Sequence, residues 1–317
     1  MRKTTNKIVL IGSGQVGVGF LWSAISQGLA SEYSIIDLNE GVAKGNVYDF
    51  QDAIATQTWD YKVEAASYES VKDADLVVIT AGRPQKLGET RLEMVADNAK
   101  IMKNIAESVK SNGFKGVTVI ASNPVDIMAS IYKEVTGFDS KKVISSGCVL
   151  DSARLKNALS QIFGHNRKDI IAYVMGEHGD SSISTFENAT IAGIPLKSSY
   201  EEKGLTKQKL DELHESVWKR AYKIIEGKGY TNFGIGSALC KISRSILRDE
   251  KLILPVGVFL TGEYNHTGVH ASIPATVGAG GIIDTHEFPL SDKEKKDFDK
   301  SVSILKDNLK VALDAIN

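Results

Sequence analysis

A glycine-rich turn near the start of the 317-residue chain limits its possible folds more than any other feature. A short β-branched stretch, residues 7–11, leads directly into Gly-Ser-Gly-Gln-Val-Gly at residues 12–17, and an apolar, helix-like stretch covers residues 18–29. In such a strand–turn–helix unit the first glycine permits a tight turn, the second lets a pyrophosphate approach the backbone, and the third lets the helix pack against the strand. The pattern predicts a dinucleotide-binding unit whose phosphates face a helix N-terminus.

An acidic residue follows the next predicted strand. Residues 32–36 are expected to form this strand, and Asp37 comes directly after it. A carboxylate at this place can accept hydrogen bonds from both ribose hydroxyls, and it would repel a 2′-phosphate, so the sequence favours NAD over NADP. The alternative is a glycine-rich turn in an unrelated α/β protein, and the combination of strand, helix and acid argues against it.

The rest of the chain predicts two domains. Apolar runs at residues 75–81, 117–121 and 142–145, with a helix at 90–111, indicate a doubly wound parallel sheet. This rhythm ends near residue 146. The remaining expected elements are a helix at 205–225 with an apolar face in the core, antiparallel strands at 252–260 and 268–276, a glycine-rich strand or turn at 278–284, and a helix at 292–316 with a Ser291/Glu294 capping box. We therefore predict an α/β protein, with an N-terminal Rossmann domain (1–145) and a C-terminal α+β substrate domain (146–317).

Composition argues against several other classes of protein. A net charge of −1 and a pI near 6.6 give no reason to expect nucleic acid or an anionic membrane as partner. The sequence contains no run of 18 apolar residues, the length needed to span a bilayer. Glycines interrupt the apolar N-terminal stretch, which is therefore not expected to be a signal peptide. Cys148 and Cys240 fit no metal spacing and are expected to be reduced core thiols. We expect a cytoplasmic protein that holds no metal.

The candidate catalytic residue is His178. Residues 170–175 predict one buried strand that ends at Gly176, and His178 follows in a glycine-bounded turn. Its imidazole can give and take a proton near neutral pH. Taken alone, however, such a histidine is more often a surface-loop residue. Asp151 and Arg154 lie three residues apart on a predicted helix, either as an intrahelical ion pair or as two groups that face a cleft.

Three further segments allow two interpretations each. The loop from Gly82 to Arg91 is either a lid over the substrate or a solvated surface loop. Asn123, at the end of a predicted strand and before a proline, either faces a ligand or simply forms a turn. Thr231, just before an apolar helical stretch, would serve as a helix N-cap without any further function.

In their order along the chain, these motifs resemble the L-lactate/L-malate dehydrogenase family over essentially the whole sequence. The resemblance rests on residues 12–17, Asp37, 81–82, 85–91, 122–126, 150–154, 176–180 and 229–231. It implies that His178 is the proton donor and acceptor and Asp151 its partner. It also implies that Arg154 binds the substrate carboxylate and that Arg91 polarises the reacting carbonyl.

The resemblance also implies an NAD site and a homotetramer. In the family, the cofactor would meet Gly12, Gly14, Val16, Gly17, Asp37, Tyr68, Ala81, Gly82, Ala121, Ser122, Asn123 and Ser146. Asn123 resembles the family residue that touches both the nicotinamide and the substrate.

Substrate choice depends mainly on Gln85. Malate-type members of the family typically have arginine at this place in the lid, where it pairs with a second carboxylate. Gln85 is neutral and should favour the methyl group of pyruvate, and Thr231 also resembles the lactate-type pocket wall. The resemblance therefore favours pyruvate and L-lactate. The alternatives are malate or a bulkier 2-hydroxy acid, and a non-catalytic NAD-binding protein.

Two positions depart from the pattern of family members that fructose 1,6-bisphosphate activates. Those proteins use an arginine where this chain has Lys156 and a histidine where it has Ile171. Lysine lacks the guanidinium fork, and isoleucine donates no hydrogen bond. We expect weak activation by this sugar bisphosphate or none.

Overall fold

The central feature of the computed structural model is a nine-stranded sheet with the order β14-β13-β12-β6-β5-β4-β1-β2-β3. The structure describes residues 6–83 and 91–317, with the backbone alone for residues 91–93. The strands of this sheet are β1 (Lys7–Ile11), β2 (Glu32–Ile36), β3 (Lys62–Ala65), β4 (Leu76–Ile79), β5 (Val117–Ile120), β6 (Val143–Ser145), β12 (Leu252–Thr261), β13 (Thr267–Gly278) and β14 (Gly281–Thr285).

The six N-terminal strands are all parallel, and β1 pairs with both β2 and β4. This order reverses direction at β1 and β4, as in a doubly wound nucleotide-binding sheet. The prediction of a Rossmann sheet is confirmed, and the predicted strand at residues 32–36 matches β2 residue for residue. The helices are α1 (Gln15–Ser26), α2 (Glu40–Ala53), α3 (Arg91–Ser111), α4 (Val125–Thr136), α5 (Val149–Phe163), α6 (Lys207–Lys228), α7 (Phe233–Arg248) and α8 (Asp292–Asp314).

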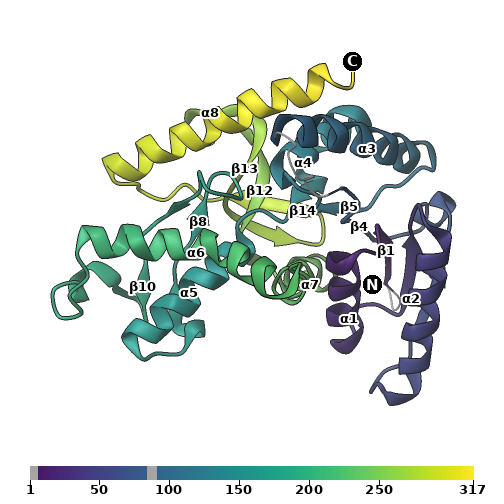
Figure 1. The fold of residues 1–317 in the computed structure, drawn as a ribbon, viewed down its shortest axis with the longest axis horizontal. Coiled ribbons are helices and arrows are strands. Elements are labelled where there is room, and N and C mark those ends of the chain that lie inside the picture. Colours follow the sequence, from purple (N-terminus) through teal and green to yellow (C-terminus); the bar gives the residue numbers. More distant parts are fainter. Residues whose placement is uncertain (1–5, 84–90) are drawn as a thin grey trace.

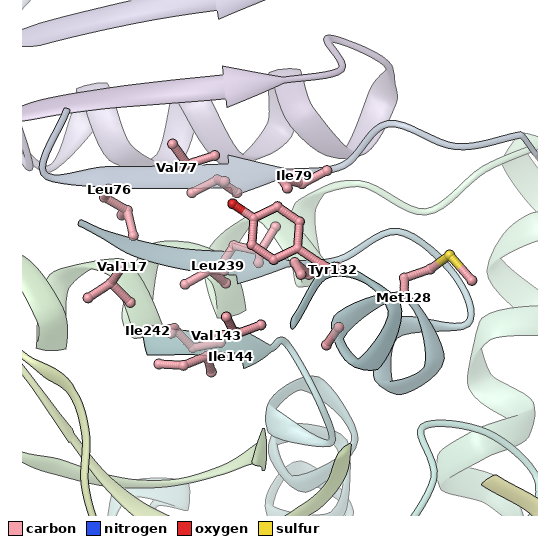
Figure 2. Packing of buried hydrophobic residues seen from close by; sticks show 14 of the residues in the cluster. Leu76, Val77, Ile79, Val117, Met128, Tyr132, Val143, Ile144, Leu239 and Ile242 are labelled. Atoms are coloured by element: carbon pink, nitrogen blue, oxygen red, sulfur yellow. The ribbon is translucent and has the colours of Figure 1, made fainter. Parts of the chain in front are cut away.

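Helices cover both faces of the parallel sheet. In Figure 2, Tyr132 and Met128 of α4 lie to one side of β5, and Leu239 of α7 lies on the other side. All three side chains are almost completely buried. Strands buried on both faces favour apolar residues, which explains the continuous apolar run of β4. In β5 the one polar residue, Thr118, has its hydroxyl hydrogen-bonded to Tyr132 of α4.

One helix of the second half packs onto the first half through glycines. A Cβ placed on Gly236 of α7 would lie 2.5 Å from the Gly19 carbonyl carbon of α1, closer than real Cβ contacts allow. The two helices can therefore cross with their backbones almost touching. Figure 1 shows α7 beside α1, with α5 and α6 farther from α1 and α8 along another side.

The antiparallel strands of the second half extend the same sheet. β12 pairs with β13 over most of its length, and it meets β6 at a single register pair, Gly257 opposite Ser145. The predicted boundary between residues 145 and 146 falls at the end of β6, and the division into two domains stays a prediction. The Ser291/Glu294 capping box of α8 is present, as predicted. Cys148 and Cys240 are free and buried, also as predicted.

The single buried strand predicted at residues 170–175 is wrong. Two short strands form instead, β7 (Ile170–Ile171) and β8 (Val174–Met175), and they belong to different sheets. Ile171 is 48% exposed, because this apolar run leaves one sheet before it enters the next. The remaining short strands are β9 (Ile183–Ser184), β10 (Thr190–Ile191) and β11 (Ile194–Pro195).

Two predictions about α6 and α7 need correction. Of the apolar face expected in the core, only Val217 of α6 is buried, while Leu210 and Leu213 are partly buried against a smaller second core. The residue at the N-cap of α7 is Asn232, with no side-chain cap bond, so Thr231 is not the cap. The N-cap explanation of Thr231 therefore fails.

Candidate active site

The turns that follow four parallel strands lie at one edge of the sheet. The Gly12 N–H donates to the Ile36 carbonyl (2.8 Å), the Ala81 N–H to Ile11 (3.1 Å), and the Ser146 N–H to Ile120 (2.8 Å). The Thr80 N–H also donates to Ile11 (2.9 Å) and the Ala121 N–H to Ile79 (2.8 Å), so the first residues after β1, β4, β5 and β6 stay in register with the neighbouring strands. This edge is where doubly wound sheets bind ligands.

The three glycines of the first turn have distinct surroundings. Gly12 has φ +93°, and a Cβ there would lie 2.5 Å from the Ala81 nitrogen. A Cβ on Gly17 would lie 2.3 Å from the Gly12 carbonyl oxygen, whereas one on Gly14 would meet no atom within 4 Å. Two of the glycines therefore serve close packing, and the third leaves the approach to the α1 N-terminus open. An open backbone at a helix N-terminus fits a pyrophosphate.

Asp37 lies directly after β2 and reaches back to this turn. Its Oδ2 accepts hydrogen bonds from the Ser13 N–H (2.7 Å) and hydroxyl (2.8 Å), and its Oδ1 accepts one from the Asn39 N–H (2.9 Å). Burial alone would raise the pKa of Asp37, but these hydrogen bonds outweigh it and lower the pKa. The side chain is therefore an oriented carboxylate at neutral pH, with lone pairs left for ribose hydroxyls.

Asn98 joins two of the turns, a role that was not predicted from the sequence. Its buried amide accepts a hydrogen bond from the Arg83 N–H (2.9 Å) and donates to the carbonyls of Arg83 (3.1 Å) and Asn123 (2.9 Å). The turns after β4 and β5 are thereby held together from behind by one side chain of α3. A lone asparagine on a helix carries no sequence signal for such a contact.

His178 and Asp151 lie in contact, as the family resemblance implied. His178 Nδ1 lies 2.5 Å from Asp151 Oδ2, although the residues are 27 positions apart. The Asp151 side chain is 3% exposed and the His178 side chain 27% exposed. Because Nδ1 faces the carboxylate, Nε2 is the ring nitrogen left for a substrate.

The carboxylate of Asp151 changes the acid–base behaviour of His178. The negative charge of Asp151 is the main cause that raises the pKa of His178, and its hydrogen bond adds to this effect, while burial opposes it. Burial alone would raise the pKa of Asp151. The charges and hydrogen bonds of His178 and Arg154 outweigh it and lower this pKa. The pair therefore holds a proton on the imidazole to higher pH than a free histidine would.

Arg154 binds the other oxygen of the same carboxylate. Its Nη1 donates to Asp151 Oδ1 at 2.9 Å, across one turn of α5. The intrahelical ion pair is therefore real, and it coexists with the contact to His178. Within residues 6–83 and 94–317 no other side chain bonds the Arg154 guanidinium, so its remaining donors are open to a ligand.

The other predicted site residues lie as follows. Val16 is on α1, Tyr68 begins a 3₁₀ turn (Tyr68–Val71), Ser122 is buried, Asn123 is exposed, and Thr231 lies between α6 and α7. Gln85 lies outside the described residues, and of Arg91 only the backbone, at the start of α3, is described.

Two negative findings concern the described part of the chain only. No three acidic, histidine or cysteine side chains there are arranged to hold a metal ion. None of its helices is long and apolar enough to cross a membrane.

The chain belongs to the lactate/malate dehydrogenase family. Residues 6–145 match the family's NAD-binding domain, and residues 148–316 match its α/β C-terminal domain. The sheet edge described above therefore lies within the part of the chain that matches the family's NAD-binding domain.

Among its relatives are two L-lactate dehydrogenases of mycoplasmas. The protein from Mycoplasma mobile is 46% identical over 316 residues, which cover 100% of this chain and 99% of the relative. The protein from Mycoplasma pneumoniae is 49% identical over 307 residues, which cover 96% and 98%. The ligand-bound crystal structure of the minor L-lactate dehydrogenase from Enterococcus mundtii superposes with a TM-score of 0.95 at 35% identity, covering 97% of this chain and 98% of that one.

Proposed function

We propose that this protein is an NAD-dependent L-lactate dehydrogenase, an oxidoreductase that interconverts pyruvate and L-lactate. The observation that carries the proposal is the Asp151 carboxylate, which contacts the His178 imidazole and the Arg154 guanidinium at once. A proton donor and a carboxylate-binding group are thereby held side by side. Full-length relatives at 46–49% identity that are named L-lactate dehydrogenase support the same activity.

The proton step falls to His178. Bound NADH supplies the hydride that reaches the carbonyl carbon of pyruvate. His178 Nε2 gives its proton to the carbonyl oxygen, and the Asp151 carboxylate stabilises the imidazolium before the transfer and fixes its orientation. In the reverse direction, neutral His178 accepts the hydroxyl proton of L-lactate through the same nitrogen.

The two arginines have separate roles in this proposal. Arg154 presents the open donors of its planar guanidinium to the substrate carboxylate, which aligns the carbonyl carbon for hydride transfer. Arg91 stabilises the developing oxyanion. In comparable sites, one such hydrogen-bond donor lowers the barrier by about 3 kcal/mol. Asn123, which lies in the turn between β5 and α4, would contact both nicotinamide and substrate.

The NAD site of the proposal uses the residues that the resemblance implied. The open approach to Gly14 and the oriented Asp37 carboxylate fit a pyrophosphate and a ribose, respectively. Gln85 and Thr231 would form the side-chain pocket for the methyl group of the substrate. A second carboxylate, as in malate, would find no cation at Gln85.

The first test is NADH oxidation with pyruvate together with NAD reduction by L-lactate. We expect both reactions, and no NAD reduction with D-lactate. A chain that binds NADH but catalyses neither reaction would be the non-catalytic alternative, and the proposal would then be wrong.

Fructose 1,6-bisphosphate is expected to leave the KM for pyruvate within about twofold of its value without the effector. Burial and the charge of Lys241 lower the pKa of Lys156, and the isoleucine at 171 presents an exposed apolar side chain. Neither feature helps to hold two phosphates. Steady-state kinetics with and without the sugar bisphosphate check this, and a tenfold or larger drop in KM would refute it.

The proposal includes a homotetramer in the cytoplasm. Family resemblance supports the tetramer, and two buried free thiols fit a reducing compartment. Sedimentation equilibrium should give four times the chain mass of 34.4 kDa. A monomer mass at assay concentrations would contradict the tetramer and leave the chemistry untouched.

A further inference from the structure

A second carboxylate lies behind the turn that carries His178. Asp126, in the first turn of α4, is 1% exposed. Its Oδ2 accepts a hydrogen bond from the main-chain N–H of His178 (3.2 Å), and its Oδ1 accepts one from the Ser145 hydroxyl (2.5 Å). The catalytic histidine is therefore held by two carboxylates: Asp151 at the ring and Asp126 at the backbone.

Ser145 and Gly257 pack tightly against the Asp126 carboxylate. The Ser145 hydroxyl that donates to Asp126 also accepts a hydrogen bond from the Gly147 N–H (3.2 Å). A Cβ on Gly257 would lie 2.0 Å from Ser145 Oγ and 2.3 Å from Asp126 Oδ1, so only glycine fits there. Gly257 opposite Ser145 is also the single pair that joins β12 to β6. The carboxylate thus lies at the seam between the parallel and antiparallel parts of the sheet.

The main chain before His178 is fixed by other groups. The Gly176 N–H donates to the Ser272 carbonyl (2.9 Å), and the Glu177 N–H donates to the Ser301 hydroxyl (2.8 Å). These anchors belong to β13 and α8. Asp126 supplies the next anchor, at His178 itself, and this anchor ties the turn to the Rossmann half. The direction in which the imidazole leaves the backbone therefore depends on this hydrogen bond.

Keeping a carboxylate in this place has a cost. Burial raises the pKa of Asp126 to about 7, although the hydrogen bonds from Ser145 and His178 oppose the rise. The charged groups that act on Asp126 are His178 and Glu177 of the same turn. Those that act on His178 are Asp151 and Arg154 of α5 and Asp126 itself. A buried carboxylate whose donors are a hydroxyl and a main-chain N–H contributes geometry more than stability.

We propose that Asp126 is a positioning residue for the reaction: its hydrogen bond to the His178 main chain holds the imidazole against Asp151. The inference rests on the proposed function, since it assigns a role within the same site. Asp126 does not touch the reacting atoms in this account. It acts through His178.

The test compares Asp126→Asn with Asp126→Ala. Asparagine keeps an oxygen that accepts from the His178 N–H and an amide that can donate to Ser145, whereas alanine removes both. We expect kcat/KM for pyruvate to fall at least about 30-fold in the alanine variant and less than about threefold in the asparagine variant. Both variants lose the negative charge of Asp126, which itself raises the pKa of His178. The alkaline limb of the pH profile should therefore lie at least about half a unit lower with alanine than with asparagine, because only alanine also loosens the contact of His178 with Asp151.

A second readout does not depend on activity. NMR titration of labelled histidine, with His178 assigned by its absence in a His178→Asn sample, should show His178 titrating at lower pH in the alanine variant than in the asparagine variant, since both lack the charge of Asp126. This measurement tests the inference even if the parent protein proves inactive with pyruvate, in which case the proposed function fails separately. Thr118→Val removes another buried hydrogen bond between β5 and α4 and serves as the matched control.

Two results would overturn the proposal. Parent-like kinetics and titration in Asp126→Ala would show that the hydrogen bond does not position His178. Equal impairment of both variants would assign the effect to the charge of Asp126 rather than to its acceptor oxygen. If Asp126→Ala no longer binds NADH, Ser145→Ala is the variant to measure, since it removes the hydroxyl that holds Asp126. A loss of kcat of roughly threefold to tenfold, with the alkaline limb of the pH profile shifted to lower pH, would support the proposal. Unchanged kcat and pH profile would contradict it.

Discussion

His178→Asn is expected to lose at least about a thousandfold in kcat for pyruvate reduction, within the range that general acid–base catalysis contributes. The variant keeps a polar side chain of similar reach, but the amide cannot supply a proton. The substitution also removes the Nδ1 donor that now contacts the Asp151 carboxylate. The side chain of Asp151 is only 3% exposed, so water does not readily replace this donor. Stopped-flow single turnovers with preformed NADH complex would measure the chemical step directly.

The pH dependence of the parent protein belongs to the same prediction. Pyruvate reduction needs the imidazolium, and Asp151 raises the pKa of His178. Activity should therefore be fully present below the pKa of an ordinary histidine and fall as pH rises through the raised value. Lactate oxidation needs the neutral ring and should show the opposite dependence. The control for folding is NADH binding, and we expect the Kd for NADH in His178→Asn to stay within about twofold of the parent value. If the variant retained a tenth of the parent kcat, the assignment of His178 as proton donor would be contradicted.

Gln85→Arg is expected to move the ratio of kcat/KM for pyruvate over oxaloacetate by at least about a hundredfold toward oxaloacetate. The guanidinium would pair with the second carboxylate of oxaloacetate, and with pyruvate it would remain without a partner inside the closed site. About 3 kcal/mol of difference is enough for this factor, since every 1.4 kcal/mol is tenfold. Steady-state kinetics with both keto acids measure it.

Gln85→Met is the matched control for this substitution. Methionine has a similar length and no charge, so it should keep the preference for pyruvate. An unchanged ratio in Gln85→Arg would mean that position 85 does not face the substrate side chain, and the sequence-based choice between lactate and malate would lose its main support.

Local patterns were sufficient to predict most of the parallel strands, although β3 (Lys62–Ala65) and α2 (Glu40–Ala53) were not among the predicted elements. Residues 7–17 contain a β-branched strand and glycines whose close contacts are visible in the structure, and Asp37 falls at the end of β2 as expected. The meeting of His178 with Asp151 was also predicted, although only the family resemblance linked residues so far apart in sequence. Both predictions rest on short segments whose chemistry is strongly constrained.

Other features depend on tertiary packing and could not be predicted. The apolar run at 170–175 has the composition of one strand, and only its neighbours decide that β7 joins β10 while β8 joins β9. Asp126 was visible in the Asn-Pro-Val-Asp motif, but its partner is a main-chain N–H 52 residues away, which no side-chain pattern reveals. Asn98 acts in the same way, through carbonyls and an N–H of two turns.

We expect this member of the lactate/malate dehydrogenase family to reduce pyruvate. The most direct measurement is NADH oxidation by the parent protein at about pH 7, with pyruvate and oxaloacetate compared side by side. We predict a kcat/KM for pyruvate at least about a hundredfold higher than for oxaloacetate. Equal or higher activity with oxaloacetate would leave the fold and the role of His178 in place, and it would contradict the assignment as an L-lactate dehydrogenase.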